Sequence, residues 1–177
     1  MARTTFSGPV RSLGGFYNQG PNTVINLANG TNTVTLDVAT YAGRIIRTND
    51  ATLVITLPAI NTTADSPNNG PGTPPATLNN VGTSYTFFIE TTASAVSIAT
   101  NGTDKFVGSL LMVDTDTSDA TTGYAPASTN DYINFNGTTT GGIAGTWVTV
   151  TVLAANKYYV QGVVLGSGTV ATPFADA

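Results

Sequence analysis

The chain has 177 residues, of which 41% are hydrophobic and 9% are charged, and its formal net charge at pH 7 is −4. It contains no histidine, no cysteine and a single glutamate, so most routes to proton transfer, covalent catalysis and zinc binding are missing. Six Lys and Arg residues cannot form the basic face that nucleic-acid binding needs, and no apolar run is long enough to span a membrane. We therefore expect a protein that is not an enzyme and has no cofactor, nucleic-acid partner or membrane partner. A surface so poor in charge favours packing against copies of itself or a larger partner.

Residues 1–21 are predicted to form an extended N-terminal docking arm. The stretch contains four glycines and two prolines and shows neither the helical nor the strand period, yet it carries large apolar side chains. Such an arm packs either on its own domain or on a neighbouring subunit, and both alternatives stay open. The residues that we expect to make capsid or subunit contacts are Arg3, Phe6, Arg11, Leu13, Phe16 and Tyr17.

The strand pattern begins after this arm. The pair Asn29-Gly30 lies between the apolar runs 23–28 and 32–38, and it predicts a β-hairpin because both central residues of such a turn need positive φ. Within residues 32–38 apolar and polar side chains alternate, which predicts a half-buried strand.

Further strands are predicted over residues 43–48 and 51–60. The apolar run 53–55 is continuous, which favours a strand that is covered on both faces. Residues 61–80 contain four prolines and two glycines, and they are predicted to form a long polar loop. Residues 84–91 and 95–100 are then expected to make a strand pair.

The last part of the chain repeats this alternation of strands and polar turns. We expect a strand over residues 105–113, a second polar loop over 114–130 and a strand over 131–135. Strands over 147–153 and 158–165 should form a hairpin across the four residues between them. No segment of ten or more residues shows helical spacing with caps. About 8–10 short strands predict an all-β fold, an antiparallel β-sandwich or jelly-roll-like domain over 22–177.

Two motifs suggest ligand binding and are interpreted as ordinary loops. Asp114, Asp116 and Asp119 alternate as calcium ligands do, but an EF-hand loop needs Gly where Asp119 stands and Glu where Ala125 stands. A solvated acidic loop is the favoured interpretation, and an irregular calcium site is the alternative. The sequence GSGTVA at 166–171 resembles a phosphate loop, but the nine residues after Gly168 include a proline and leave no room for the helix that phosphate binding needs.

Four carboxylates could in principle pair as in a glycosidase. Asp50, Glu90, Asp104 and Asp131 show no spacing that brings two of them together, and chance proximity is the simpler interpretation. Trp147 is the only tryptophan of the chain. We expect it to be a core aromatic rather than a platform on which a sugar stacks.

Several stretches of the chain carry a resemblance to a known class of proteins. TTFSGPVRSLGGF near the start, then LVITLPA, GTSYTFFIET, SIATNGTDKFVG and GTWVTVTVLAANKYYVQGVVLGSGT, are similar to small virion proteins of tailed, especially marine, bacteriophages. The positions that carry the pattern are Leu57, Pro58, Gly82, Tyr85, Phe87, Trp147, Val150, Tyr158, Val160 and Gly162. The resemblance implies an all-β head-decoration (cement) protein, commonly trimeric, that binds the major capsid protein on the virion surface after assembly in the host cytoplasm.

Two other functions remain open from the sequence. The first is a tail or fibre-tip module that binds a receptor or carbohydrate. The second is an adhesion or ice-binding protein outside viruses, suggested by the Thr-rich strands TNTVT and TVTV.

Overall fold

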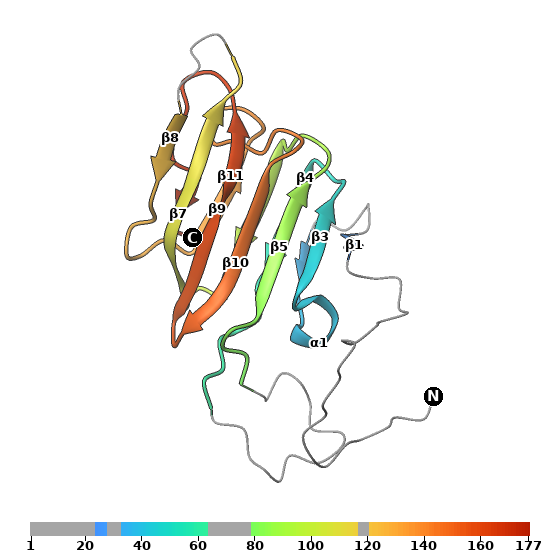
Figure 1. Ribbon diagram of the computed structural model, residues 1–177, viewed down its shortest axis with the longest axis vertical. Helices are drawn as coiled ribbons and strands as arrows, with labels where there is room; N and C mark the ends of the chain where they lie inside the picture. Colours follow the sequence, from blue (N-terminus) through green and yellow to red (C-terminus); the bar gives the residue numbers. More distant parts are fainter. Residues whose placement is uncertain (1–23, 28–32, 64–78, 117–120) are drawn as a thin grey trace, which may run out of the picture.

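The computed structural model describes residues 24–27, 33–63, 79–116 and 121–177. These residues form a nearly all-β structure with one helical turn (Figure 1). The elements in chain order are β1 (Val24–Leu27), β2 (Thr33–Thr35), α1 (Val38–Tyr41), β3 (Arg44–Thr48), β4 (Thr52–Thr56), β5 (Ser84–Ile89), β6 (Ala95–Ala99), β7 (Lys105–Asp114), β8 (Thr121–Tyr124), β9 (Tyr132–Phe135), β10 (Trp147–Ala154), β11 (Lys157–Gly166) and β12 (Phe174–Ala175).

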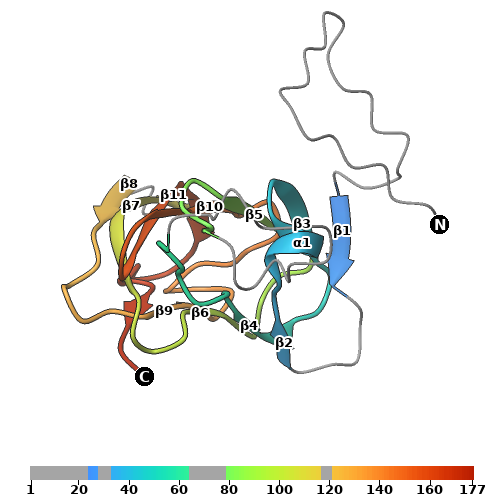
Figure 2. The same cartoon turned by 90° about the horizontal axis from the view of Figure 1, so that it is seen from below.

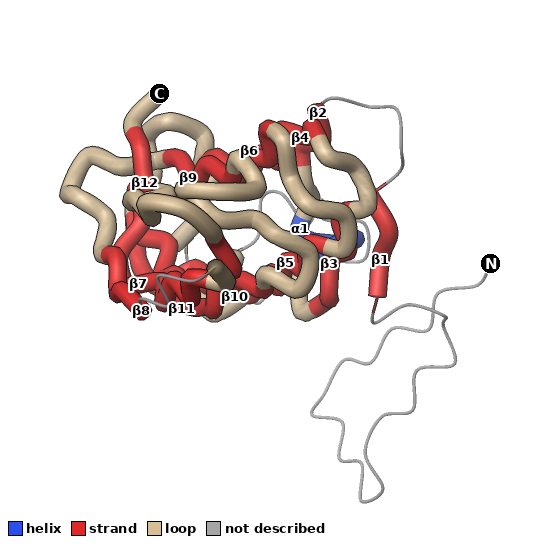
Figure 3. The backbone as a smooth tube through the Cα atoms, turned by 90° about the horizontal axis from the view of Figure 1, so that it is seen from above, coloured by secondary structure: helices blue, strands red, loops and turns tan. Residues whose placement is uncertain are grey.

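The strands form two sheets. A seven-stranded sheet has the order β1-β3-β5-β10-β11-β7-β8, and a five-stranded sheet has the order β12-β9-β6-β4-β2. Seen along their edges, the two sheets lie as two layers that face each other (Figures 2 and 3). The side chains between the layers form one hydrophobic core to which both sheets contribute. The prediction of an all-β fold is confirmed.

The five-stranded sheet presents an apolar row to this core. One residue from each strand stands in register across the whole sheet, and these residues are Val34, Ile55, Ile98, Ile133 and Phe174. Val34 is half-buried and the other four are buried. Branched and aromatic side chains of this kind pack well on a pleated surface, so the row joins five strands that are far apart in the sequence.

The first six strands alternate between the two sheets, and this path decides their directions. β1, β3 and β5 lie in the seven-stranded sheet, whereas β2, β4 and β6 lie in the five-stranded sheet. Neighbours within one sheet are therefore two strands apart in the chain, and they run parallel. β7 and β11 also pair in parallel. The prediction of an antiparallel fold is thus wrong for five of the ten strand pairings.

The same path overturns two predicted strand pairs. β1 and β2, which flank Asn29-Gly30, belong to different sheets and do not form a hairpin with each other; residues 28–32 lie outside the described residues. β5 and β6 are also in different sheets, so 84–91 and 95–100 are not a strand pair. In both cases each strand pairs within its own sheet and buries one face in the shared core.

Two further expectations are corrected at the level of single strands. The strand expected over 32–38 ends at Thr35, and α1 follows, because the side chain of Asp37 accepts a hydrogen bond from the backbone N–H of Thr40 at 2.8 Å and caps the helical turn. The run 53–55 does not lie between two layers. Leu53 and Ile55 are buried whereas Val54 is half-buried, so β4 alternates like a strand with one core face.

The C-terminal hairpin is confirmed. β10 and β11 pair antiparallel from Trp147 with Val163 to Ala154 with Lys157, with a bulge near Val152. Asn156 in the turn has a φ of 59°, the left-handed conformation that Asn tolerates better than most residues.

The two predicted loops differ in the structure that the described residues form. The ends of loop 61–80 are held together, since the backbone N–H of Asn61 donates to the Asn80 side chain at 2.9 Å and that side chain donates to the carbonyl of Ala59 at 2.9 Å. The segment 114–130 is not a plain loop, because β8 lies within it and pairs with β7. The arm over 1–21, with its six expected contact residues, lies outside the described residues.

Candidate functional site

The outer face of the seven-stranded sheet carries a row of large apolar side chains. Trp147 of β10 stands opposite Phe88 of β5 on one side and Val163 of β11 on the other, and Val163 stands opposite Leu111 of β7. These four residues, here called the outer row, come from four adjacent strands. Because neighbouring strands lie about 4.8 Å apart, the row extends roughly 14 Å across the sheet.

The outer row faces solvent rather than the core. Its exposed fractions are 37% for Phe88, 52% for Trp147, 41% for Val163 and 44% for Leu111. The strand neighbours of these residues point the other way and are buried, for example Val148. Scattered single apolar residues on a surface are common, but four in register on one sheet face make this face the candidate binding surface.

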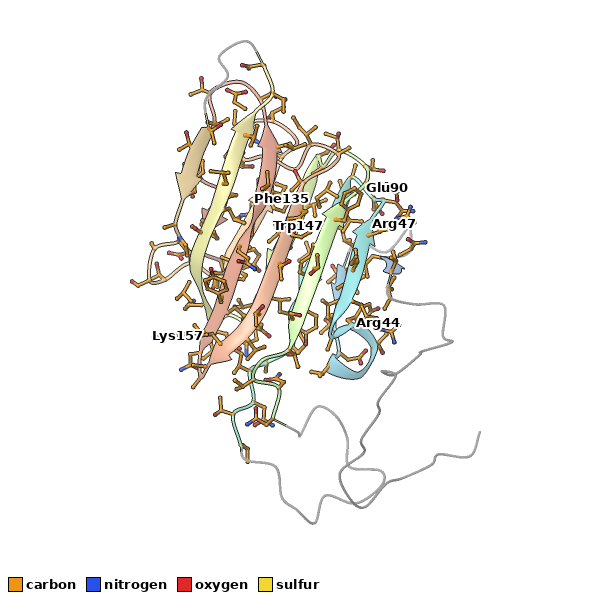
Figure 4. All side chains as sticks on the ribbon, viewed as in Figure 1. Arg44, Arg47, Glu90, Phe135, Trp147 and Lys157 are labelled. Atoms are coloured by element: carbon orange, nitrogen blue, oxygen red, sulfur yellow. The ribbon has the colours of Figure 1, made fainter. Side chains whose placement is uncertain are left out.

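The position of Trp147 corrects the expectation of a core aromatic. In WVTVTV the buried residues are Val148, Val150 and Val152, so the alternation of the strand turns Trp147 outward. The alternating valines were visible in the sequence and were the signal that could have placed the indole on the outer face. Figure 4 shows Trp147 on the broad face of the seven-stranded sheet.

The two ends of the outer row differ. Next to Phe88 the register places Arg47 of β3, whose guanidinium forms an ion pair with Glu90 (Figure 4). Both side chains are more than a third exposed, so this pair contributes at most about 1 kcal/mol to stability. At the other end Leu111 stands opposite Gly123 of β8, which has no side chain to cover it. The outer row is therefore bordered by the Arg47–Glu90 ion pair at the Phe88 end, and at the Leu111 end no side chain of its β8 partner covers it.

The next row along the sheet is polar and uncharged. The hydroxyl groups of Thr86 and Thr149 lie 3.0 Å apart, and Gln161 and Ser109 continue the row in register. A ligand on the outer face thus meets apolar surface beside groups that donate and accept hydrogen bonds without the cost of removing water from a charge.

The four carboxylates that could pair as in a glycosidase are each engaged in structural bonds. Asp104 is buried and accepts from the backbone N–H of Ile60 at 3.0 Å. Asp131 is buried and accepts from Lys105 Nζ at 2.8 Å and from the backbone N–H of Ala177 at 3.0 Å. These bonds tie loops to the ends of β7 and β9, which explains the burial of both acids without catalysis.

The other two candidate carboxylates are also bonded. Glu90 pairs with Arg47, and Asp50 accepts from the backbone N–H of Thr52 at 3.2 Å. Each of the four acids thus accepts a hydrogen bond from the backbone or pairs with a basic side chain in the described part of the chain.

The expected acidic loop contributes to the fold through its backbone contacts. Asp114 Oδ1 accepts from the N–H of Asp116 at 3.2 Å, and Asp116 Oδ2 accepts from the N–H of Gly168 at 2.6 Å, which ties this loop to the GSGTVA turn. Asp119 lies outside the described residues. Among the residues that the structure describes, no three His, Cys, Asp or Glu side chains are grouped so that they could hold a metal ion.

A buried tyrosine closes the core near the start of loop 61–80. The hydroxyl of Tyr158 donates to the carbonyl of Pro58, and burial raises the pKa of this phenol far above its ordinary value of 10.0. Burial also raises the pKa of Tyr85. Both phenols belong to the buried hydrophobic core.

Comparisons with family models, curated proteins and solved structures give no match to this chain. In the described ranges, none of the helical structure is long and apolar enough to cross a membrane.

Proposed function

We propose that the protein is a structural component of a tailed-bacteriophage virion, a decoration (cement) protein that binds the outer capsid surface and reinforces the shell. The observation that carries the proposal is the outer row: four large apolar residues in register on an exposed sheet face, beside a row of uncharged polar groups. Interfaces between proteins are enriched in aromatic residues at their centre and depleted of charge there. The resemblance of several stretches of the sequence to phage virion proteins points to the same class.

The architecture fits this role. We infer that the two sheets form a β-sandwich, since two layers around one core define that class; the parallel pairs set it apart from a regular jelly roll. A capsid shell repeats each contact many times by symmetry, so a weak contact of one copy still strengthens the whole. Association of the copies as a homotrimer, with the major capsid protein as the partner, is part of the proposal. No catalytic step is needed.

Electron microscopy of purified virus particles tests this assignment directly. A copy of the protein with an affinity tag is incorporated during infection, and the tag is labelled with gold. Label over the head surface, together with heads that resist heat better when the protein is present, is the expected result. Label confined to the tail, or particles without label, would contradict a capsid role.

A tail or fibre-tip module that binds carbohydrate is the second candidate. The observation that favours it is the 52% exposure of Trp147, because a flat aromatic ring stacks on the apolar face of a sugar. The polar groups of Thr149 and Gln161 on the same face could bind sugar hydroxyls. A glycan array separates the candidates: specific binding that disappears in Trp147→Ala and persists in Leu153→Ala would favour the tail module. Leu153 is the control because it is equally exposed on the same strand, outside the outer row.

A further inference from the structure

We propose that the N-terminal arm, residues 1–21, of a neighbouring copy lies along the outer row and links adjacent copies of the protein. The inference rests on the proposed function in one respect, the packing of copies beside one another on a shell. The identity of the occupant is argued from the outer face itself and from the composition of the arm.

The first argument is the match in apolar character. The outer row offers four large apolar side chains on one face, exposed by 37% to 52%. The arm carries four large apolar side chains in a stretch that has no strand or helical period of its own, and they are Phe6, Leu13, Phe16 and Tyr17. A segment without periodicity cannot bury such residues within a helix or sheet of its own, so it gains most by lying on an apolar surface.

The second argument is charge. The described residues include four Lys or Arg and eight Asp or Glu, a net charge of −4. The arm contains Arg3 and Arg11 and no acidic residue. A cationic segment is therefore attracted to the anionic body of the same protein, and this attraction acts between copies as well as within one.

The third argument is the path of the chain. β1 enters the seven-stranded sheet at its edge, and its residue Asn26 stands in the same register as Arg47, Phe88 and Trp147. The arm precedes this edge strand in the chain, so it is attached at the edge of the sheet where a copy packed alongside would approach.

The arm is long enough for this contact. β1 lies three strand spacings from β10, about 14 Å. A stretch of 21 residues spans up to about 70 Å when extended. The arm can therefore leave one copy and still cross the whole outer row of the next.

The single tryptophan makes the contact measurable in full-length protein. An arm variant replaces Phe6, Leu13, Phe16 and Tyr17 by Ser and keeps Trp147 as the probe. Without the arm as cover, tryptophan emission should move to longer wavelength and acrylamide quenching should increase roughly twofold. Far-ultraviolet circular dichroism checks that the variant keeps the β fold of the native protein.

Mixing then identifies the copy that supplies the arm. A second protein carries Trp147→Phe and an intact arm, so it contributes no tryptophan signal. Added to the arm variant, it should restore the native emission in a concentration-dependent manner. When the arm variant also carries Phe88→Ser, the concentration of Trp147→Phe protein that restores half of the native emission should rise about tenfold. When it carries Leu153→Ser instead, this concentration should stay unchanged.

Two results would overturn the inference. If the arm variant and the native protein have the same emission and quenching, the arm does not cover the outer row. If they differ but the Trp147→Phe protein never restores the signal, the arm comes from the same chain and does not link copies. Neither measurement uses capsids, so a negative result would refute the arm contact without bearing on the proposed decoration function.

Discussion

Gly162 stands where the seven-stranded sheet has no room for a side chain, and its replacement by Ala is a sharp test of the fold. It lies in β11 between Val148 of β10 and Leu110 of β7, in a row that faces the core. An added Cβ would be 2.8 Å from the Cα of Val148 and closer still to the carbonyl oxygen of Trp147. Both atoms belong to the backbone, so no side chain can rotate away and β10 itself would have to shift.

The magnitude follows from two opposing effects. Forcing extra volume into a packed interior costs about 1–3 kcal/mol, occasionally more. Ala also restricts the unfolded chain, which recovers roughly 0.4–1 kcal/mol. The expected net loss in the free energy of unfolding is about 1–2 kcal/mol, which lowers the melting temperature by roughly 2–8 °C for a chain of this size.

Gly123→Ala is the matched control for this prediction. Gly123 lies in the same sheet with no positive φ, and an added Cβ there would meet no atom of the described residues within 4 Å. Its melting temperature should be unchanged or slightly raised. Thermal and urea unfolding followed by circular dichroism measure both variants. If Gly162→Ala is as stable as Gly123→Ala, the close approach of β10 and β11 described above is wrong.

The remaining predictions concern charge, pH and association. Lys105→Met should cost about 1–3 kcal/mol in urea unfolding, because it removes the ion pair of the buried Asp131, whereas Lys157→Met on the exposed end of β11 should stay within about 0.5 kcal/mol. Burial raises the pKa of the Tyr158 hydroxyl, so this group deprotonates at lower pH in the unfolded state than in the folded state. The free energy of unfolding should therefore fall as the pH rises above 10.0. Tyr158→Phe should make this fall shallower. Sedimentation at micromolar concentration should show a species larger than the 18.1 kDa monomer, and a monomer at every concentration would count against self-association in solution. Esterase, glycosidase and phosphatase assays should show no turnover above buffer, and reproducible turnover lost on changing one carboxylate would contradict the structural role.

Local signals in the sequence predicted the elements whose partners are close along the chain. The hairpin of β10 and β11 is an example, because only two residues join the two strands and buried and outward side chains alternate along both. The all-β class followed in the same way from strand-length apolar runs without helical spacing. Composition also pointed to a surface poor in charge, which the outer row and the polar row beside it illustrate.

The pairing of strands was decided by tertiary structure. Asn29-Gly30 has the chemistry of a tight hairpin, yet β1 and β2 each bury one face in the common core from opposite layers. A turn signal concerns a few residues, whereas a strand gains free energy along its whole length from the layer that it joins. The parallel pairs follow from that choice and cannot be read from any one segment.

The outer row, too, could be predicted only in part from the sequence. The alternation in WVTVTV by itself determines that the side chains of Trp147 and Val148 point to opposite faces of the strand. It does not determine which of these faces lies on the core, and that knowledge is needed to place the indole on the outside. The outer row as a unit requires the registers of β5, β10, β11 and β7, which bring together residues from position 88 to position 163. Side-chain direction is a property of one strand, but a surface is a property of neighbouring strands, and only the folded sheets define which strands are neighbours.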